Sequence, residues 1–133
     1  MKKEFFKRAA QNIGRYGDND ALPFDIENRF IKDKADEISQ LAYEFFTSES
    51  KANEGKGVKK SKIKDISIMN EQLLVPVGAS GFRVITKIHP FWSVYFNGLS
   101  VGIADKIEEK RSKNVYSYRF KREDETGGLF DQN

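Results

Sequence analysis

Apolar residues recur at helical spacing in three stretches of the chain. In the first, Phe5, Ala9 and Ile13 fall on one stripe, which predicts a short amphipathic helix over residues 3–14. In the second, apolar residues with the same period follow Asp33, whose carboxylate can cap the free N–H groups of a helix that begins near it. Both helices are expected to bury one face, and neither pattern points to chemistry.

The third and clearest helical pattern follows His89 and Pro90. Pro90 suits the first turn of a helix, where its missing N–H would have no partner. Apolar residues then recur every four positions, at Phe91, Tyr95, Leu99, Ile103 and Ile107. Gly98 and Gly102 lie on a neighbouring stripe, and each costs about 1 kcal/mol relative to alanine. That cost is tolerable where another backbone approaches the helix closely.

Alternation of apolar and polar positions predicts strands in the second half of the chain. Residues 73–77 form a short apolar run interrupted by Pro76, which is typical of an edge strand. A turn over residues 78–81 precedes a second strand over 82–88, and a third is expected over 115–120. Side chains alternate between the two faces of a strand. In the second strand we expect Phe82 and Val84 to be buried and, on the opposite face, Arg83 and Lys87 to be exposed.

Together these patterns predict an α+β fold: N-terminal helices plus a small antiparallel sheet packed on one long amphipathic helix. The length of 133 residues suits a single domain. Within it we expect a helical N-terminal segment over residues 1–48, a flexible lysine-rich loop over 49–64, and a hairpin, helix and strand over 65–133. Few apolar residues interrupt the stretch from 47 to 64, so we expect it to be the most mobile internal segment.

Composition excludes several classes of site. The chain has no cysteine, which rules out a disulfide scaffold, a thiolate metal site and a cysteine nucleophile. His89 is the only histidine, so a histidine-based metal cluster is also excluded. The first residues contain no apolar stretch long enough for a signal peptide, and no window approaches the roughly 20 apolar residues of a membrane span. We therefore expect a cytoplasmic protein without membrane contact.

Acidic residues offer no rigid metal site. Two-metal phosphoryl transfer needs carboxylates that converge on Mg²⁺, as in the aspartate pair that polymerases carry at a strand turn. That pair is absent from the sequence. Asp18 with Asp20, and Asp124 with Glu125, lie in polar, glycine-rich segments that would not hold ligands rigidly. We expect neither pair to bind a catalytic metal, and no cofactor on this chain.

Positive charge is unevenly distributed and suggests contacts to nucleic acid. The net charge is +3, but residues 1–17 and 51–64 are strongly basic while residues 18–50 are acidic. Arg83 and Lys87 share one strand face, where they could contact phosphates. Lys59, Lys60 and Lys62 could form a second phosphate-contacting arm. Solvated lysines and ordinary exposed strand cations explain the same patterns, and this alternative stays open.

A family resemblance favours the nucleic-acid interpretation. The chain resembles the fingers region of bacterial reverse transcriptase-like proteins, RNA-directed DNA polymerases of the group associated with antiphage defence. The resemblance is carried, in order, by Arg15-Tyr16-Gly17-Asp18-Asn19-Asp20, Leu22-Pro23-Phe24, Glu27-Asn28, Gly81-Phe82-Arg83, Ile88-His89-Pro90-Phe91-Trp92, Ile107-Glu108 with Arg111, and Ser117-Tyr118-Arg119-Phe120. His89 departs from the family, which favours an acidic residue there, and we interpret it as structural.

The resemblance implies a nucleic-acid-contacting part of such a protein, RNA or DNA being its partner. The catalytic palm of the family has no counterpart in the 133 residues, so we expect no polymerase activity from this chain alone. Mg²⁺ is expected only together with the missing palm. The remainder of the polymerase, or a second copy of the chain, is a further possible partner.

Two alternatives remain open. The chain could be a noncatalytic module for protein–protein interaction or dimerisation, in which the Gly98 and Gly102 stripe docks a partner. The aromatic stripe of Tyr116, Tyr118 and Phe120 could stack bases, although alternating aromatics on a strand more often belong to a core.

Overall fold

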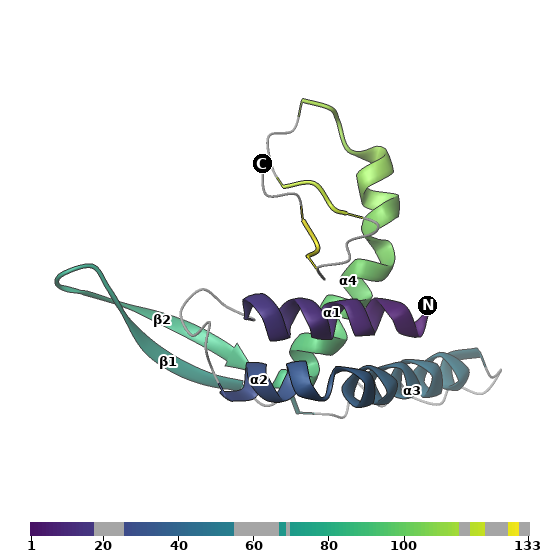
Figure 1. The fold of residues 1–133 in the computed structure, drawn as a ribbon, viewed down its shortest axis with the longest axis horizontal. Coiled ribbons are helices and arrows are strands. Elements are labelled where there is room, and N and C mark those ends of the chain that lie inside the picture. Colours follow the sequence, from purple (N-terminus) through teal and green to yellow (C-terminus); the bar gives the residue numbers. More distant parts are fainter. Residues whose placement is uncertain (18–25, 55–66, 69, 115–117, 122–127, 131–133) are drawn as a thin grey trace.

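The fold is α+β, as the sequence predicts (Figure 1). The computed structural model describes residues 1–17, 26–54, 67–68, 70–114, 118–121 and 128–130. Its elements, in chain order, are α1 (Lys3–Tyr16), α2 (Ile26–Asp33), α3 (Ala35–Glu54), β1 (Asn70–Val77), β2 (Gly81–Ile88) and α4 (Pro90–Lys110). Within the described residues, no helix is long and apolar enough to cross a membrane.

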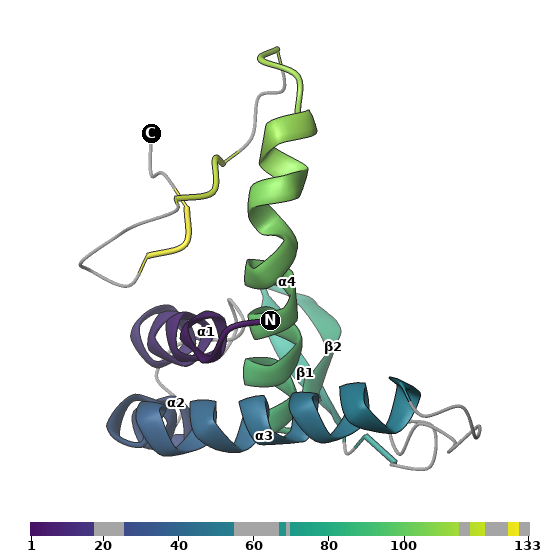
Figure 2. The same cartoon turned by 90° about the vertical axis from the view of Figure 1, so that its right-hand side faces the viewer.

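The helices gather around the first half of α4. In both ribbon views the start of α4 lies among α1, α2 and α3, whereas its second half extends beyond them (Figures 1 and 2). The β1–β2 hairpin projects from this helical body to one side (Figure 1). The C-terminal segment, by which we mean residues 118–121 and 128–130, lies beside the second half of α4.

Aromatic side chains form the main core where α1, α3 and α4 meet. Phe6, Ala42, Trp92 and Tyr95 are buried there. The Phe6 and Tyr95 rings stack with centroids 5.8 Å apart, and Phe45 meets Tyr95 edge-on at 5.2 Å. Such pairs add to the free energy gained from area burial. A second cluster of Ala10, Ile13, Ile31 and Val94 joins α1 and α2 to α4.

The two glycines of α4 accommodate side chains of α1 and of Met1, which precedes it. A Cβ atom at Gly98 would collide with the Phe6 ring, and one at Gly102 would collide with the Sδ of Met1. Close approach explains both glycines, but the approaching atoms belong to side chains and not to a backbone. The glycine stripe is therefore occupied within the chain, which removes the surface expected for a docking partner.

The N-terminal helices differ from the prediction at their boundaries. The first helix passes Gly14 and ends at Tyr16, and Gly17 follows with a φ of 84°. Asp33 closes α2, a helix that the sequence analysis missed, and does not cap the next one. The Lys34 N–H donates a hydrogen bond of 2.9 Å to the Phe30 carbonyl, and the Ile38 N–H donates one of 2.9 Å to the Lys34 carbonyl. The backbone therefore stays close to a helical path between α2 and α3.

Helix α3 extends past the predicted boundary. Residues 47–54 belong to α3, so the helix passes the boundary at residue 49. The hydroxyls of Thr47 and Ser48 donate hydrogen bonds of 2.8 Å to the carbonyls of Tyr43 and Phe45. These hydroxyl groups find hydrogen-bond acceptors within the helix itself, so polar residues at these positions do not mark the end of the helix. Residues 55–64 of the predicted loop lie outside the described residues.

The sheet consists of two antiparallel strands among the described residues. Its register pairs Asn70 with Ile88 at the base and Val77 with Gly81 at the tip. Ile88 packs against the aromatic core, so the sheet is anchored at its base to the helix that follows it. The predicted third strand is not found in its described part, residues 118–120, where Phe120 makes only an isolated bridge to Phe130.

Candidate functional site

The β1–β2 hairpin is the first candidate site because it projects from the helical body and carries Arg83 (Figure 1). Its turn contains Gly78, whose φ of 67° favours glycine over any residue with a Cβ atom. The two strands pair over their full length, so the hairpin presents two faces. Both faces carry apolar side chains, and Arg83 and Lys87 share their face with the half-buried Leu73, Val75 and Ile85.

One face is apolar and exposed in its distal half. Leu74 lies opposite Val84, and Pro76 lies opposite Phe82. Relative exposures of 71% for Leu74, 60% for Val84 and 74% for Phe82 show that these side chains contact solvent. We call Leu74, Pro76, Phe82 and Val84 the apolar hairpin face. The predicted burial of Phe82 and Val84 is therefore wrong, because their half of the hairpin extends beyond the helices that would cover it.

The opposite face carries the two predicted cations in different settings. Arg83 is exposed, and no hydrogen bond or ion pair joins its side chain to another residue of the described part of the chain. Lys87 forms an ion pair with Glu27 of α2, and its side chain is only 12% exposed. The expected exposure of Lys87 is wrong, since the base of the hairpin meets α2 there.

Distance also separates the two cations. Lys87 follows Arg83 by four strand positions, which corresponds to about 13 Å along the strand at the usual rise per residue. Lys87 is also paired with Glu27, so the two cations do not form one joint phosphate site in this structure. The other predicted phosphate contacts, Lys59, Lys60 and Lys62, lie outside the described residues.

His89 has a structural contact, in line with its interpretation from the sequence. It precedes α4 as the N-cap residue, and its Nδ1 accepts a hydrogen bond of 3.2 Å from the Phe91 N–H. This contact satisfies one of the free N–H groups at the start of the helix. Pro90 occupies the first turn, as predicted.

Acidic side chains do not converge among the residues that the structure describes. No group of three or more His, Asp or Glu residues there could hold a metal ion. The acidic pairs at Asp18 and Asp20, and at Asp124 and Glu125, lie outside the described residues.

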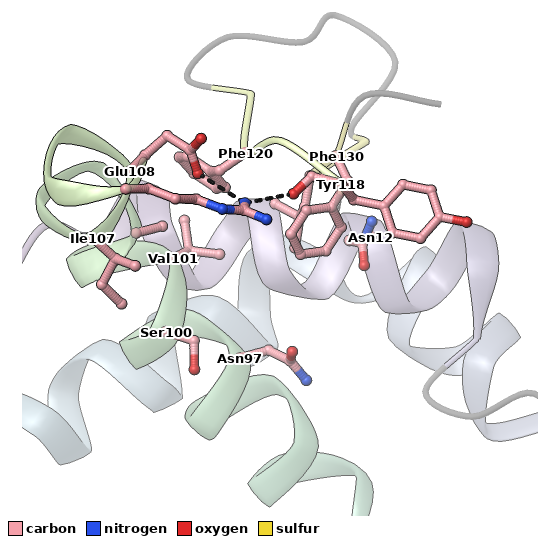
Figure 3. Close-up of a pocket in the computed structure, with 12 residues that line it drawn as sticks. Asn12, Asn97, Ser100, Val101, Ile107, Glu108, Tyr118, Phe120 and Phe130 are labelled. Carbon is pink, nitrogen blue, oxygen red and sulfur yellow. Dashed lines mark hydrogen bonds and ion pairs between the residues drawn. The ribbon is translucent and has the colours of Figure 1, made fainter. Parts of the chain in front are cut away.

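A second candidate site is a pocket of about 270 Å³ between α1, the second half of α4 and the C-terminal segment (Figure 3). Three aromatic residues of the C-terminal segment line it: Tyr118, Phe120 and Phe130. Asn12 of α1 and Asn97 of α4 contribute side-chain amides. The sequence analysis missed this site, because its lining comes from three segments distant in the chain. The one sequence feature that hints at it is Asn97, a polar residue between Phe96 and Gly98.

Glu108 organises charge at one end of this pocket. Its carboxylate oxygens accept hydrogen bonds from Arg119 at 2.5 Å and from Arg111 at 3.3 Å. The Arg119 hydrogen bond is the largest of the effects that lower the pKa of Glu108, and the Arg111 contact adds to it, while partial desolvation opposes both. Glu108 is therefore ionised at neutral pH and balances part of the positive charge of the two arginines.

Comparison with protein-family models, curated proteins and solved structures found no significant match to the chain. The arguments for its function therefore come from its own residues and from the resemblance given above.

Proposed function

We propose that the chain is a fingers-like, nucleic-acid-contacting part of a reverse transcriptase-like protein, and that the β1–β2 hairpin makes the contact. The family resemblance supports the proposal through residues on and beside this hairpin, namely Gly81-Phe82-Arg83 and the start of α4. In this proposal catalysis belongs to a palm that the 133 residues do not contain, and Mg²⁺ binds there. The proposal includes a cytoplasmic location for the protein.

The observation that carries the proposal is the setting of Arg83. Arg83 pairs with Val75 in the half of the hairpin nearer the turn, and its side chain is exposed and without an ion-pair partner in the described part of the chain. A guanidinium in this state can donate two parallel hydrogen bonds to a phosphate. Phe82 and Val84 flank Arg83 in the sequence but lie on the opposite, apolar hairpin face, where they are exposed and offer contacts for bases. Lys87 is less suited, because Glu27 already neutralises it.

Oligonucleotide binding at several salt concentrations tests the proposal. Single-stranded RNA and DNA should bind to the full chain with an affinity that falls as salt rises. Arg83→Ala should weaken binding and reduce the log–log salt slope by about 0.7, the contribution of one phosphate contact to a single strand. Arg83→Lys keeps the charge, so it should retain most of the slope while losing affinity if two parallel hydrogen bonds matter.

Lys110→Ala is the matched control. It removes the same charge from an exposed residue at the far end of α4. This variant should bind like the unaltered chain. An Arg83→Ala variant whose salt slope equals that of Lys110→Ala would remove the hairpin from the interface. Chains that bind no RNA or DNA at low salt would overturn the proposal as a whole.

The apolar hairpin face favours a second candidate function, a noncatalytic interaction or dimerisation module. Three of its side chains are more than half exposed, at 71%, 60% and 74% for Leu74, Val84 and Phe82, and both strand edges are unpaired among the described residues. Exposed apolar side chains next to open strand edges favour pairing with another chain.

Size-exclusion chromatography with light scattering distinguishes the second candidate from the first. A concentration-dependent dimer that is lost in Leu74→Ser, without any binding to RNA or DNA, would support the interaction module. A monomer at all concentrations that binds RNA or DNA would support the nucleic-acid proposal.

A further inference from the structure

Hydrogen bonds between described residues position one wall of the pocket at the second half of α4. Its aromatic wall, the C-terminal segment, is tied down by three arginines. Arg8 donates a hydrogen bond of 2.6 Å to the Lys121 carbonyl, and its guanidinium lies 5.2 Å from the centre of the Phe120 ring. Arg111 donates to the Tyr118 carbonyl at 2.8 Å, and Arg119 donates to the Ser112 carbonyl at 3.1 Å. These contacts hold the wall in place without a ligand.

Aromatic rings and amides face one another across this pocket. Figure 3 shows Tyr118 and Phe130 on one side, Asn97 and Ser100 of α4 on the other, and Asn12 of α1 between them. Tyr118 and Phe130 are 66% and 51% exposed, so their rings retain surface that a ligand could cover. Aromatic rings with a few well-placed polar groups are typical of small-molecule sites.

The amides leave hydrogen-bonding capacity for a ligand. Asn97 donates its Nδ2 to the Ser93 carbonyl at 2.8 Å, which orients the amide and leaves its Oδ1 as an acceptor. No hydrogen bond joins the Asn12 side chain to another residue of the described part of the chain, so its amide can both donate and accept. Together the two amides offer two acceptor oxygens and the N–H donors that the Ser93 carbonyl does not occupy.

Charge and size narrow the class of ligand. Arg111, the cation that lines the pocket, is paired with Glu108, so an anion gains little there. A volume of about 270 Å³ lies at the small end of ligand sites, which suits a single ring system. Val101, Ala104, Ile107 and Leu129 add aliphatic surface to the lining, and Tyr118 and Phe130 add rings that favour stacking on a flat ligand.

We propose that this pocket binds an uncharged, flat heteroaromatic ring with hydrogen-bonding edges, of the nucleobase class. Tyr118 and Phe130 stack on the ring, and the amides of Asn12 and Asn97 bind its edge. This goes beyond the function proposed for the hairpin, because a base without phosphate is recognised without Arg83. The pocket can therefore bind a base whether or not the hairpin contacts nucleic acid.

Adenosine and cytidine are suitable probes, since both are uncharged at neutral pH. The full chain is titrated up to about 10 mM, which detects millimolar affinities. Two-dimensional NMR should show the side-chain amide signals of Asn12 and Asn97 shifting with the amides of the C-terminal segment. Ribose alone should cause no shift. Tyr118→Ala should weaken nucleoside binding about fivefold or more, the usual loss when one base–aromatic stack is removed.

Phe30→Ala is the matched control, because it removes a similarly exposed aromatic ring from α2, outside both candidate sites. Its nucleoside affinity should be unchanged, as should that of Arg83→Ala. No shifts at the highest concentration, or shifts that persist with equal affinity in Tyr118→Ala, would overturn the proposal. The two proposals fail separately, since Tyr118→Ala should leave the salt slope for oligonucleotides unaltered while Arg83→Ala reduces it.

Discussion

The helical core and the β1–β2 hairpin use the same residue types in opposite ways. Phe6 is fully buried between α3 and α4, whereas Phe82 is 74% exposed on the hairpin. Val94 in α4 is fully buried, whereas Val84 in β2 is 60% exposed. Both regions read as apolar in the sequence, yet only one of them buries its apolar side chains within the chain.

This difference separates residues that serve the fold from residues that remain available for a partner. Burial of a large apolar side chain contributes about 1.5–3 kcal/mol to folding. The apolar hairpin face forgoes most of that contribution within the chain. A contact with a surface outside the chain would recover that contribution, and both functions proposed for the hairpin make use of this.

The largest effect that tests this comparison comes from removing one phenylalanine from each region. Phe6→Ala should lower the free energy of unfolding by about 3–5 kcal/mol, because it leaves a cavity beneath Tyr95 in the aromatic core. Phe82→Ala should change it by less than about 0.5 kcal/mol, since the ring contacts mainly solvent. Chemical denaturation followed through Trp92 fluorescence measures both variants. Equal losses would show that the hairpin is part of the core.

A smaller pair of effects, of opposite sign, lies on α4 itself. Gly98→Ala gains about 1 kcal/mol of helix propensity but pushes a methyl group into the buried Phe6 ring, and such overpacking costs about 1–3 kcal/mol. We expect a net loss of stability. Gly102→Ala meets the Met1 side chain, which is flexible and 41% exposed and can move aside, so we expect a net gain of up to about 1 kcal/mol.

Thermal unfolding of the two alanine variants checks this pair. If both are destabilised equally, Met1 is held as firmly as Phe6, and the core extends further along α4 than its burial indicates. If both are stabilised, the close packing of Phe6 against Gly98 is relaxed in solution.

The sequence was sufficient for the elements that bury a periodic apolar face. The first helix, the long helix after Pro90 and the hairpin with its turn are confirmed, because spacing of apolar residues reports directly on one-sided burial. The missed helix α2 has only eight residues, too few for periodicity to stand out. The end of α3 was missed because the serine, threonine and lysine in its sequence resemble loop composition.

The candidate sites were harder to predict from the sequence than the helices and strands. Alternation in β2 correctly separates Arg83 from Phe82, but it does not say which face is covered, and the wrong face was expected to be buried. Lys87 looks equivalent to Arg83 until Glu27, sixty residues earlier, is found beside it. The pocket depends on contacts between α1, α4 and the C-terminal segment, which no local pattern reports.

The two cations of β2 provide a third test of where the fold ends and the free hairpin begins. Lys87→Ala removes a partly buried ion pair with Glu27 and should lower the free energy of unfolding by about 0.5–1 kcal/mol. Arg83→Ala should leave stability unchanged, because Arg83 has no ion-pair partner in the described part of the chain. Urea denaturation distinguishes the two. A destabilised Arg83→Ala variant would show that the distal hairpin also supports the fold.

The smallest effect concerns the C-terminal segment. Aromatic rings hold the core, whereas charged side chains help to hold this segment. Its anchor Glu108 has a lowered pKa, chiefly because Arg119 donates a hydrogen bond to it. A lowered pKa in the folded state means that the contribution is present at neutral pH and is lost as pH falls below the ordinary glutamate range. On acidification, NMR signals of Tyr118 and Phe130 should therefore shift before the indole signal of Trp92. Glu108→Gln should reproduce that shift at neutral pH. A C-terminal segment that moves only when Trp92 also moves would mean that it unfolds with the core.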